Sequence, residues 1–160
     1  MMLYLLRHGE AEAQAANGAS RKLSNKGRGD IISVARQFVD NKLPAPRCIS
    51  SPYTRALQTA RLFLDQINPG QKPEQSELLT PEIRASEVMK LLETISDEHV
   101  LLVSHNPLMS ELNALLTDGD ISQMHILGTS EFVLISIDII GLGMGKKTLR
   151  LLPEANAVAS

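Results

Sequence analysis

Three segments of the sequence place arginine or histidine side chains at or soon after the ends of apolar runs. Arg7 and His8 follow the first run, Arg55 lies a few residues beyond the second, and His105 comes just after the third. These side chains are costly to bury without a partner, so their positions favour a site that receives a ligand. A neutral imidazole can attack phosphorus, and guanidinium groups pair with phosphate oxygens and neutralise charge in the transition state. The combination predicts phosphoryl transfer.

The predicted chemistry runs in two steps and needs no metal. Water can hydrolyse a phosphohistidine formed on the attacking imidazole, which splits one difficult displacement into two. A second histidine, if protonated, adds another charged donor. His8, His99, His105 and His125 show no short metal-ligand spacing, so we expect neither a metal nor a cofactor. Gly9 is expected to let the backbone approach a ligand closely.

Apolar runs alternate with helical patterns, which predicts βαβ units and a mostly parallel sheet. The strands expected in this part of the chain are Met2–Leu6, Arg47–Ser50 and His99–Val103. Ligands of open α/β sheets bind at the carboxyl ends of the strands. We therefore expect Arg7, His8, Arg55 and His105 to meet at one edge of the sheet.

Four helices are expected from amphipathic spacing and from capping signals. They are a helix capped by Ser24 that runs to about Asn41, Pro52–Ile67 with Ser51 as its N-cap, Ile83–Ile95, and Pro107–Leu116 with Asn106 as its N-cap. Glu77–Leu79 is predicted as a short extended segment. The fold class is therefore predicted as three-layer α/β/α, with residues 1–152 as a single domain and residues 153–160 as a loose C-terminal tail.

The C-terminal part is predicted to differ from the rest of the sheet. Glu131–Ile139 and Lys146–Leu152 flank a glycine-rich turn, which is typical of an antiparallel hairpin. The turn segment GMGKKT is similar to a phosphate-binding loop, but Ile140 stands where that motif needs its first glycine. The segment also lies between two β-like runs rather than before a helix, so a hairpin turn is the preferred interpretation.

Composition narrows the class of protein. The chain has 160 residues, 43% of them hydrophobic, 21% charged and only 3% aromatic, which predicts a globular protein with an aliphatic core. One cysteine, Cys48, rules out an internal disulfide, and without a signal peptide or membrane span we expect a cytoplasmic protein. The net charge of -2 gives no case for nucleic acid or a membrane surface. Residues 1–80 carry 11 Lys and Arg against 7 Asp and Glu, so this half is expected to meet an anionic ligand.

The segments LRHGEAE, SSPYTRALQTA and VSHNP together resemble the histidine phosphatase superfamily, with its phosphoglycerate-mutase-like fold. The resemblance implies that His8 is the nucleophile and that Arg7, Arg55 and His105 form the phosphate pocket. The short chain and the stretch SRKLSNKG look most like the SixA-type branch, the protein-histidine phosphatases. In that branch Arg21 would be an outer phosphate contact. This chain has Leu-Ser where the branch usually has Leu-Thr, which keeps the hydroxyl.

The resemblance leaves the substrate to be argued from chemistry. Phosphomonoesterases of this fold usually protonate the leaving oxygen with a carboxylic acid, whereas a departing imidazole, with a pKa of about 6.5, leaves more readily. Glu10, Glu77 and Glu82 are the available acids, and none stands in a matching context. We therefore expect a monomer that dephosphorylates the histidine-containing phosphotransfer domain of a sensor kinase in a phosphorelay. A small-molecule phosphomonoesterase that uses Glu77 or Glu82, and a phosphohistidine-binding module without turnover, remain alternatives.

Overall fold

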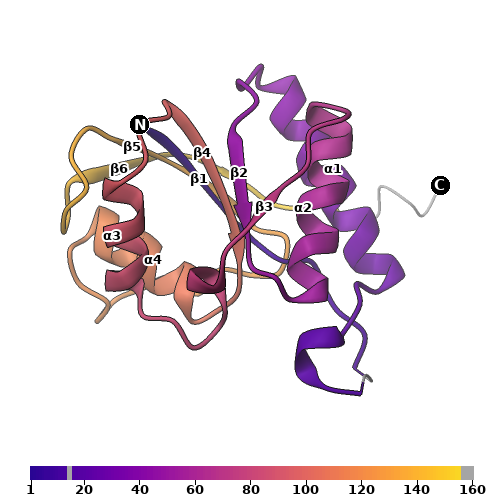
Figure 1. The fold of residues 1–160 in the computed structure, drawn as a ribbon. Coiled ribbons are helices and arrows are strands. Elements are labelled where there is room, and N and C mark those ends of the chain that lie inside the picture. Colours follow the sequence, from indigo (N-terminus) through magenta and orange to yellow (C-terminus); the bar gives the residue numbers. More distant parts are fainter. Residues whose placement is uncertain (14–15, 156–160) are drawn as a thin grey trace.

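A computed structural model describes residues 1–13 and 16–155 and shows a six-stranded sheet covered by helices on both faces (Figure 1). The strand order is β3-β2-β4-β1-β5-β6; the strands from β3 to β1 are parallel, and β5 and β6 are antiparallel. The strands are β1 (Met2–Arg7), β2 (Arg47–Ser50), β3 (Glu74–Gln75), β4 (His99–Ser104), β5 (Phe132–Ile137) and β6 (Gly145–Leu151). The helices are α1 (Asn25–Asp40), α2 (Thr54–Ile67), α3 (Ala85–Glu93) and α4 (Leu108–Thr117). The predicted three-layer α/β/α architecture with an antiparallel C-terminal hairpin is confirmed.

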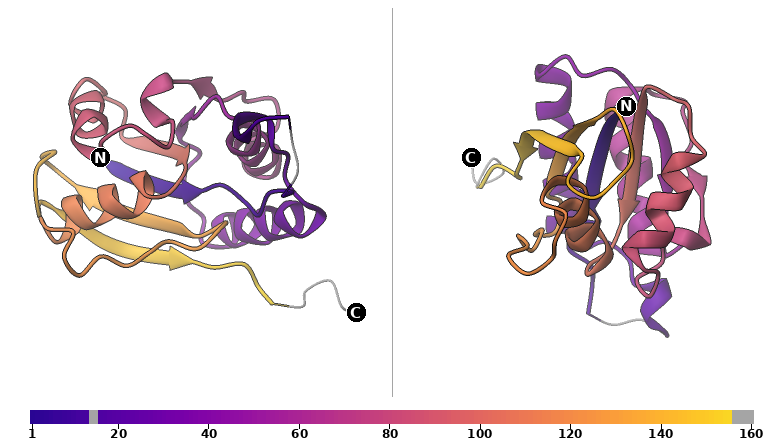
Figure 2. Two further views of the ribbon diagram at one scale, coloured as in Figure 1. Left: turned by 90° about the horizontal axis from the view of Figure 1, so that it is seen from below. Right: turned by 90° about the vertical axis from the view of Figure 1, so that its left-hand side faces the viewer.

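Alternate side chains of each central strand enter two separate cores, as the period of a β-strand requires. Tyr4 and Leu6 of β1 pack with α1 and α2, whereas Leu3 and Leu5 pack with α3 and α4 on the other face. Figure 2 shows the two helix pairs on opposite sides of the sheet. The expectation of an aliphatic core holds on the α3–α4 side only. The other core gathers four of the chain's five aromatic side chains, Tyr4, Phe38, Phe63 and Phe132.

The two helices predicted to start at a proline begin later than expected. Ser51 was expected to cap a helix beginning at Pro52, but α2 begins at Thr54 and no side chain caps it. The Ser51 hydroxyl instead accepts the backbone N–H of Tyr53 at 3.2 Å. The helix expected to begin at Pro107 begins one residue later, at Leu108. The predicted cap at Ser24 is confirmed, since its hydroxyl accepts the N–H of Gly27.

The edge of the sheet next to β2 also differs from the prediction. Glu77–Leu79, expected to be extended, forms one turn of 3₁₀ helix, and the strand that pairs with β2 is Glu74–Gln75. Helix α3 covers residues 85–93, shorter at both ends than expected. Of the predicted tail, the backbone N–H of Glu154 donates to Ser33 on α1. Residues 156–160 lie outside the described part of the chain.

Gly9 and Gly27 allow the loop after β1 to lie directly on α1. A β-carbon on Gly9 would meet the Gly27 carbonyl oxygen at 3.0 Å, and one on Gly27 would meet the Glu10 carbonyl oxygen at 2.2 Å. Gly9 was expected to make room for a ligand, but the close neighbours of that position are protein atoms. Within residues 1–13 and 16–155, none of the helices combines the length and apolar character needed to cross a membrane.

Candidate active site

The predicted site residues meet because β1, β4 and β2 are parallel neighbours that end at the same edge. Arg7, the last residue of β1, pairs in register with Ser104, the last residue of β4. His8 and His105 are the residues that follow, and the His8 backbone N–H donates to the Ser104 carbonyl. The rings of the two histidines lie 5.1 Å apart between their centroids. The expectation that these strand ends form one polar cluster is confirmed.

His8 is a buried, neutral imidazole with one nitrogen available. Its exposed fraction is 8%, and Nδ1 lies 2.7 Å from the Gly9 carbonyl oxygen. Because a carbonyl only accepts, Nδ1 carries the proton and Nε2 keeps its lone pair. The Arg55 Nε–H donates to that Nε2 at 3.3 Å. Burial, together with the nearby positive charges of Arg55, Arg7 and Arg21, lowers the pKa of His8 to about 4.

His105 is held by a hydroxyl on the neighbouring strand end. Its Nε2 lies 2.7 Å from the Ser51 Oγ, while its buried Nδ1 has no partner among the described residues. The Ser51 hydroxyl accepts the N–H of Tyr53, and among the described residues His105 Nε2 is the acceptor within reach of its own proton. That arrangement leaves the proton of the ring on Nδ1. Burial and the adjacent His8, Arg55 and Arg7 lower the pKa of His105 to about 3 in the ligand-free site.

Arg55 enters the site from the first turn of α2. Its exposed fraction is 9%; besides His8, it donates from Nη1 to the Gly18 carbonyl at 2.7 Å and lies over the Tyr53 ring at 5.2 Å. Burial lowers the pKa of Arg55, and the neighbouring Arg21 and Arg7 lower it further. Among residues 1–13 and 16–155, no ion pair balances the charge of this guanidinium. An anion beside it would lower the free energy of the site.

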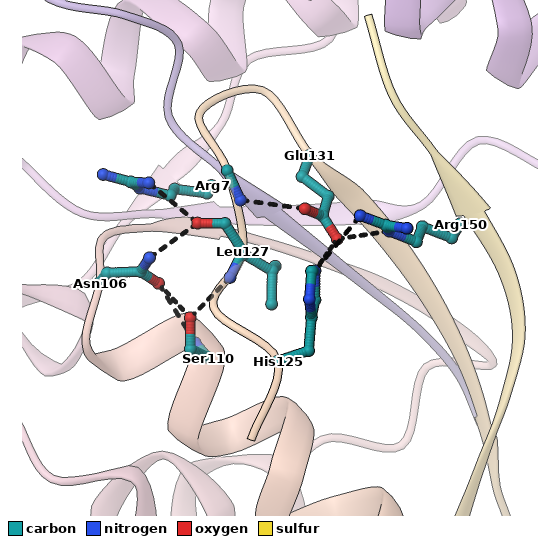
Figure 3. A network of polar contacts seen from close by, with 8 residues as sticks. Arg7, Asn106, Ser110, His125, Leu127, Glu131 and Arg150 are labelled. Carbon is teal, nitrogen blue, oxygen red and sulfur yellow. Dashed lines mark hydrogen bonds and ion pairs between the residues drawn. The ribbon is translucent and has the colours of Figure 1, made fainter. Parts of the chain in front are cut away.

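Arg7 turns toward the segment that joins α4 to β5 (Figure 3). Its Nη1 donates to the Leu127 carbonyl at 2.9 Å, and its buried Nε has no partner in the described residues. Burial lowers the pKa of Arg7, and the charge of Glu131 partly offsets this effect. No carboxylate oxygen of residues 1–13 and 16–155 lies within 4 Å of the Arg7 or Arg55 guanidinium. The site therefore presents two unneutralised guanidinium groups.

Arg21 lies at the rim rather than in the buried cluster. It follows the short 3₁₀ helix Gly18–Ser20 and donates from Nε to the Glu12 carbonyl at 2.8 Å. Its charge nevertheless lowers the pKa of His8 and of Arg55, so it belongs to the same electrostatic environment.

The candidate acids lie apart from this cluster. Glu77 and Glu82 are exposed, and neither makes a hydrogen bond to a predicted site residue among those described. Glu10 is half-buried, and its carboxylate lies 3.9 Å from the Lys26 ammonium. Residues 1–13 and 16–155 also hold no group of three or more His, Cys, Asp or Glu side chains arranged for a metal ion. What the site offers a ligand is therefore arginine and histidine nitrogens.

Two contributors to the site were not predicted from the sequence. Ser51 was assigned to a helix cap, and its second contact, to His105, depends on how two strands are placed side by side. The Leu127 carbonyl is a backbone group, and because every residue has one, the sequence cannot show which carbonyl contributes to a site. The segment around it follows no strand of the parallel sheet, so the rule that ligands bind at carboxyl ends of strands does not point to it.

Comparison with known proteins identifies the class that this fold and site define. Residues 3–80 match the histidine phosphatase superfamily (branch 1). The chain is 30% identical over 146 residues, 89% of each chain, to the phosphohistidine phosphatase SixA of Escherichia coli (strain K12). It therefore belongs to the histidine phosphatase superfamily, as a SixA-type hydrolase.

Further relatives agree with this assignment. The SixA homolog of Haemophilus influenzae is 33% identical over 131 residues, which cover 72% of this chain and 77% of that one. A solved structure of the protein histidine phosphatase SixA complexed with tungstate superposes with a TM-score of 0.86, at 28% identity, over 96% of this chain and 97% of that one. A SixA structure from Agrobacterium tumefaciens has the same fold, with a TM-score of 0.78 at 22% identity over 95% of this chain and 97% of the other.

Proposed function

We propose that this protein is a phosphohistidine phosphatase that acts on a protein substrate through a phosphohistidine on His8. The observation that carries the proposal is the state of His8, a buried neutral imidazole. Its Nε2 lone pair lies beside Arg55, and its ring centroid lies 5.1 Å from that of His105. Such a nitrogen is a nucleophile once a phosphate oxygen takes over the Arg55 Nε–H that its lone pair accepts. Arg7 and Arg55 supply the charge that a phosphoryl group needs.

The reaction has two displacements on one phosphorus atom. His8 Nε2 attacks, a new N–P bond forms, and the substrate's N–P bond breaks as its imidazole leaves with a proton from solvent. Water then attacks the phosphorus, the bond to His8 breaks, and inorganic phosphate leaves. Arg7 and Arg55 hold the phosphate oxygens in both steps, Arg21 contacts them from the rim, and the His105 Nδ1–H donates to them.

The charge on phosphorus needs no metal ion in this proposal. The guanidinium groups of Arg7 and Arg55 have no carboxylate partner in the described part of the chain, and guanidinium groups match phosphate oxygens in a bidentate manner. A phosphate dianion opposes the causes that lower the pKa of His105, so binding favours its protonated form. We expect chelators to leave the turnover number unchanged.

The proposed substrate is the phosphorylated histidine-containing phosphotransfer domain of a sensor kinase in a cytoplasmic phosphorelay, met by a monomer of this chain. The names of the SixA relatives support a phosphohistidine substrate. The exposure of Glu77 and Glu82 supports a leaving group that needs no enzymatic acid. A departing imidazole, with a pKa of about 6.5, is such a group.

The test measures phosphate release from a phosphotransfer domain that carries phosphohistidine. The same measurement is made on a panel of phosphate monoesters for comparison. We expect kcat/KM on the phosphohistidine protein to exceed that on any monoester by more than about 100-fold, with Glu77→Gln and Glu82→Gln changing neither. Faster monoester turnover that is lost in one of these variants would instead establish a small-molecule phosphomonoesterase. Stable binding of the phosphoprotein without release would establish a binding module.

A further inference from the structure

A buried carboxylate, Glu131, organises the segment that contacts Arg7. We use the name 125–131 loop for the last seven residues of the segment that connects α4 to β5. Glu131 is 1% exposed, and its Oε1 accepts the backbone N–H of Gly128 at 2.9 Å. Its Oε2 accepts from Arg150 Nε on β6 and lies by His125 Nε2, both at 2.8 Å (Figure 3). One side chain thus joins both ends of the loop to the neighbouring strand.

The other side of the loop is held by Ser110 of α4 and by Asn106, which lies just before that helix. The Leu127 carbonyl accepts from Asn106 Nδ2 at 2.8 Å as well as from Arg7 Nη1 at 2.9 Å. The Leu127 N–H donates to the Ser110 hydroxyl at 2.9 Å, and that hydroxyl donates to Asn106 Oδ1 at 2.7 Å. The peptide group that receives Arg7 is therefore fixed at its nitrogen and at its oxygen.

Glu131 does this as an anion. Burial raises its pKa, but the hydrogen bonds from Arg150, from the Gly128 N–H and from His125 outweigh burial, and the net pKa is lowered. The carboxylate is thus ionised at neutral pH and is not a proton donor. The backbone N–H of Arg7 donates to the Glu131 carbonyl at 3.1 Å, but the Glu131 carboxylate makes no hydrogen bond to the Arg7 side chain among the described residues. The carboxylate therefore reaches the Arg7 guanidinium through the loop and through its charge.

We propose that Glu131 is a positioning residue for Arg7. By closing the 125–131 loop it holds the Leu127 carbonyl in place, and that carbonyl occupies Nη1 and leaves the buried Nε of Arg7 free for a phosphate oxygen. The inference rests on the proposed role of Arg7 as a phosphate ligand. It adds a buried residue, outside the cluster at the strand ends, on which the geometry of that cluster depends.

The direction in which Glu131→Gln shifts the Kd for phosphate distinguishes a positioning role from a purely electrostatic one. Glu131→Gln keeps the size of the side chain and an oxygen for the Gly128 N–H, but it removes the negative charge. If Glu131 acted only as a charge, neutralising it would make the site more positive and tighten the binding of inorganic phosphate. If it positions Arg7, the same change weakens phosphate binding by about 10-fold, the loss of about one hydrogen bond to a charged group. Isothermal titration of the whole protein with inorganic phosphate measures this.

A double-mutant cycle with Arg7→Lys tests the route. Lysine has no planar fork to orient, so in the Arg7→Lys background Glu131→Gln should change the phosphate Kd by less than about 2-fold. Effects that multiply in the double variant would overturn the proposal, as would a tighter Kd in Glu131→Gln alone. Glu74→Gln is the matched control, because its carboxylate also pairs with an arginine, Arg47, but touches no residue of the site. It should leave Kd unchanged.

A second variant, which changes no charge, tests the proposal even if Glu131→Gln fails to fold. Ser110→Ala removes the hydroxyl that holds the Leu127 N–H and changes no charge. We expect it to weaken phosphate binding several-fold in the wild-type background and not in Arg7→Lys; an unchanged Kd would contradict the proposal. Because inorganic phosphate is the probe, absence of phosphohistidine turnover would refute only the proposed function. An Arg7→Lys variant with unaltered Kd would overturn the inference together with its premise.

Discussion

The two histidines at the strand ends differ in which ring nitrogen carries the proton, because their hydrogen-bond partners differ. The Gly9 carbonyl fixes the proton of His8 on Nδ1, so its Nε2 faces Arg55 with a lone pair. The Ser51 hydroxyl accounts for Nε2 of His105 and leaves Nδ1 as the donor. A nucleophile and a donor side by side are what attack on a phosphoryl group requires.

The pKa values of these histidines give a prediction at the same scale. In the ligand-free protein we expect the His8 ring to titrate near pH 4 and His105 near pH 3, because burial and neighbouring arginines oppose their protonation. His8 then stays an unprotonated nucleophile down to about pH 4. NMR titration of the imidazole ring protons checks this. A midpoint near 6.5 for His8 would contradict it.

Single residues were the most predictable part of the site. His8, Arg7, Arg55 and His105 could be selected because polar side chains after apolar strands are unusual, and the structure brings all four together. The Leu127 carbonyl could not, since a backbone acceptor has no signature in the sequence. Glu131 could not either, because a carboxylate at the start of a strand is ordinarily a surface charge.

At the scale of elements, the site depends on how closely the loop after β1 lies on α1. His8 precedes Gly9, which lies against Gly27 of α1, and α1 in turn packs on α2, which carries Arg55. The two glycines therefore set the distance between a strand end and a helix that both contribute to the site. Parallel strand order was predictable from alternating patterns; this contact between two glycines 18 positions apart was not.

Two glycines of α1, Gly27 and Gly29, give a matched pair of alanine substitutions within one helix. Gly27→Ala places a β-carbon 2.2 Å from the Glu10 carbonyl oxygen, so α1 must shift, and we expect a loss of about 1–3 kcal/mol in the free energy of unfolding. Gly29→Ala meets nothing within 4 Å and should gain up to about 1 kcal/mol from helix propensity. Urea denaturation measures both. Equal effects of the two substitutions would contradict this account of the contact.

The helix starts show why local signals fail near a site. Ser51 followed by proline is a strong capping signal, yet the Ser51 hydroxyl contacts Tyr53 N–H and His105 and the helix begins three residues later. His105 follows β4, which pairs directly with β2 but lies about 50 residues further along the chain, so no local rule could predict the contact. Departures from local preference are expected where side chains serve a site.

For the molecule as a whole, burying neutral histidines makes stability depend on pH. The unfolded chain takes up protons on histidine below about pH 6.5, while folded His8 and His105 stay neutral to about pH 4 and about pH 3. The unfolded state thus binds more protons, and stability falls as the pH falls through this window. The cores on either side of the sheet must compensate for a site that is unfavourable when empty.

We expect the free energy of unfolding to drop between pH 7 and pH 5, with about 2 kcal/mol of the loss coming from each of the two histidines. His105→Gln removes one of these groups, so its loss over the same range should be smaller than that of the wild type by about that amount. Urea denaturation of both proteins at the two pH values provides the comparison. Parallel losses in the two proteins would contradict the assigned protonation state of His105.

The central claim is that His8 receives the phosphoryl group. Mixing the protein with a ³²P-labelled phosphohistidine domain and quenching in alkali within one turnover should trap label on this chain, and peptide mapping should locate it at His8. His8→Ala should show neither label nor phosphate release, while Gly29→Ala should show both. Phosphate release by His8→Ala, or wild-type turnover with no labelled enzyme at any time, would contradict the account.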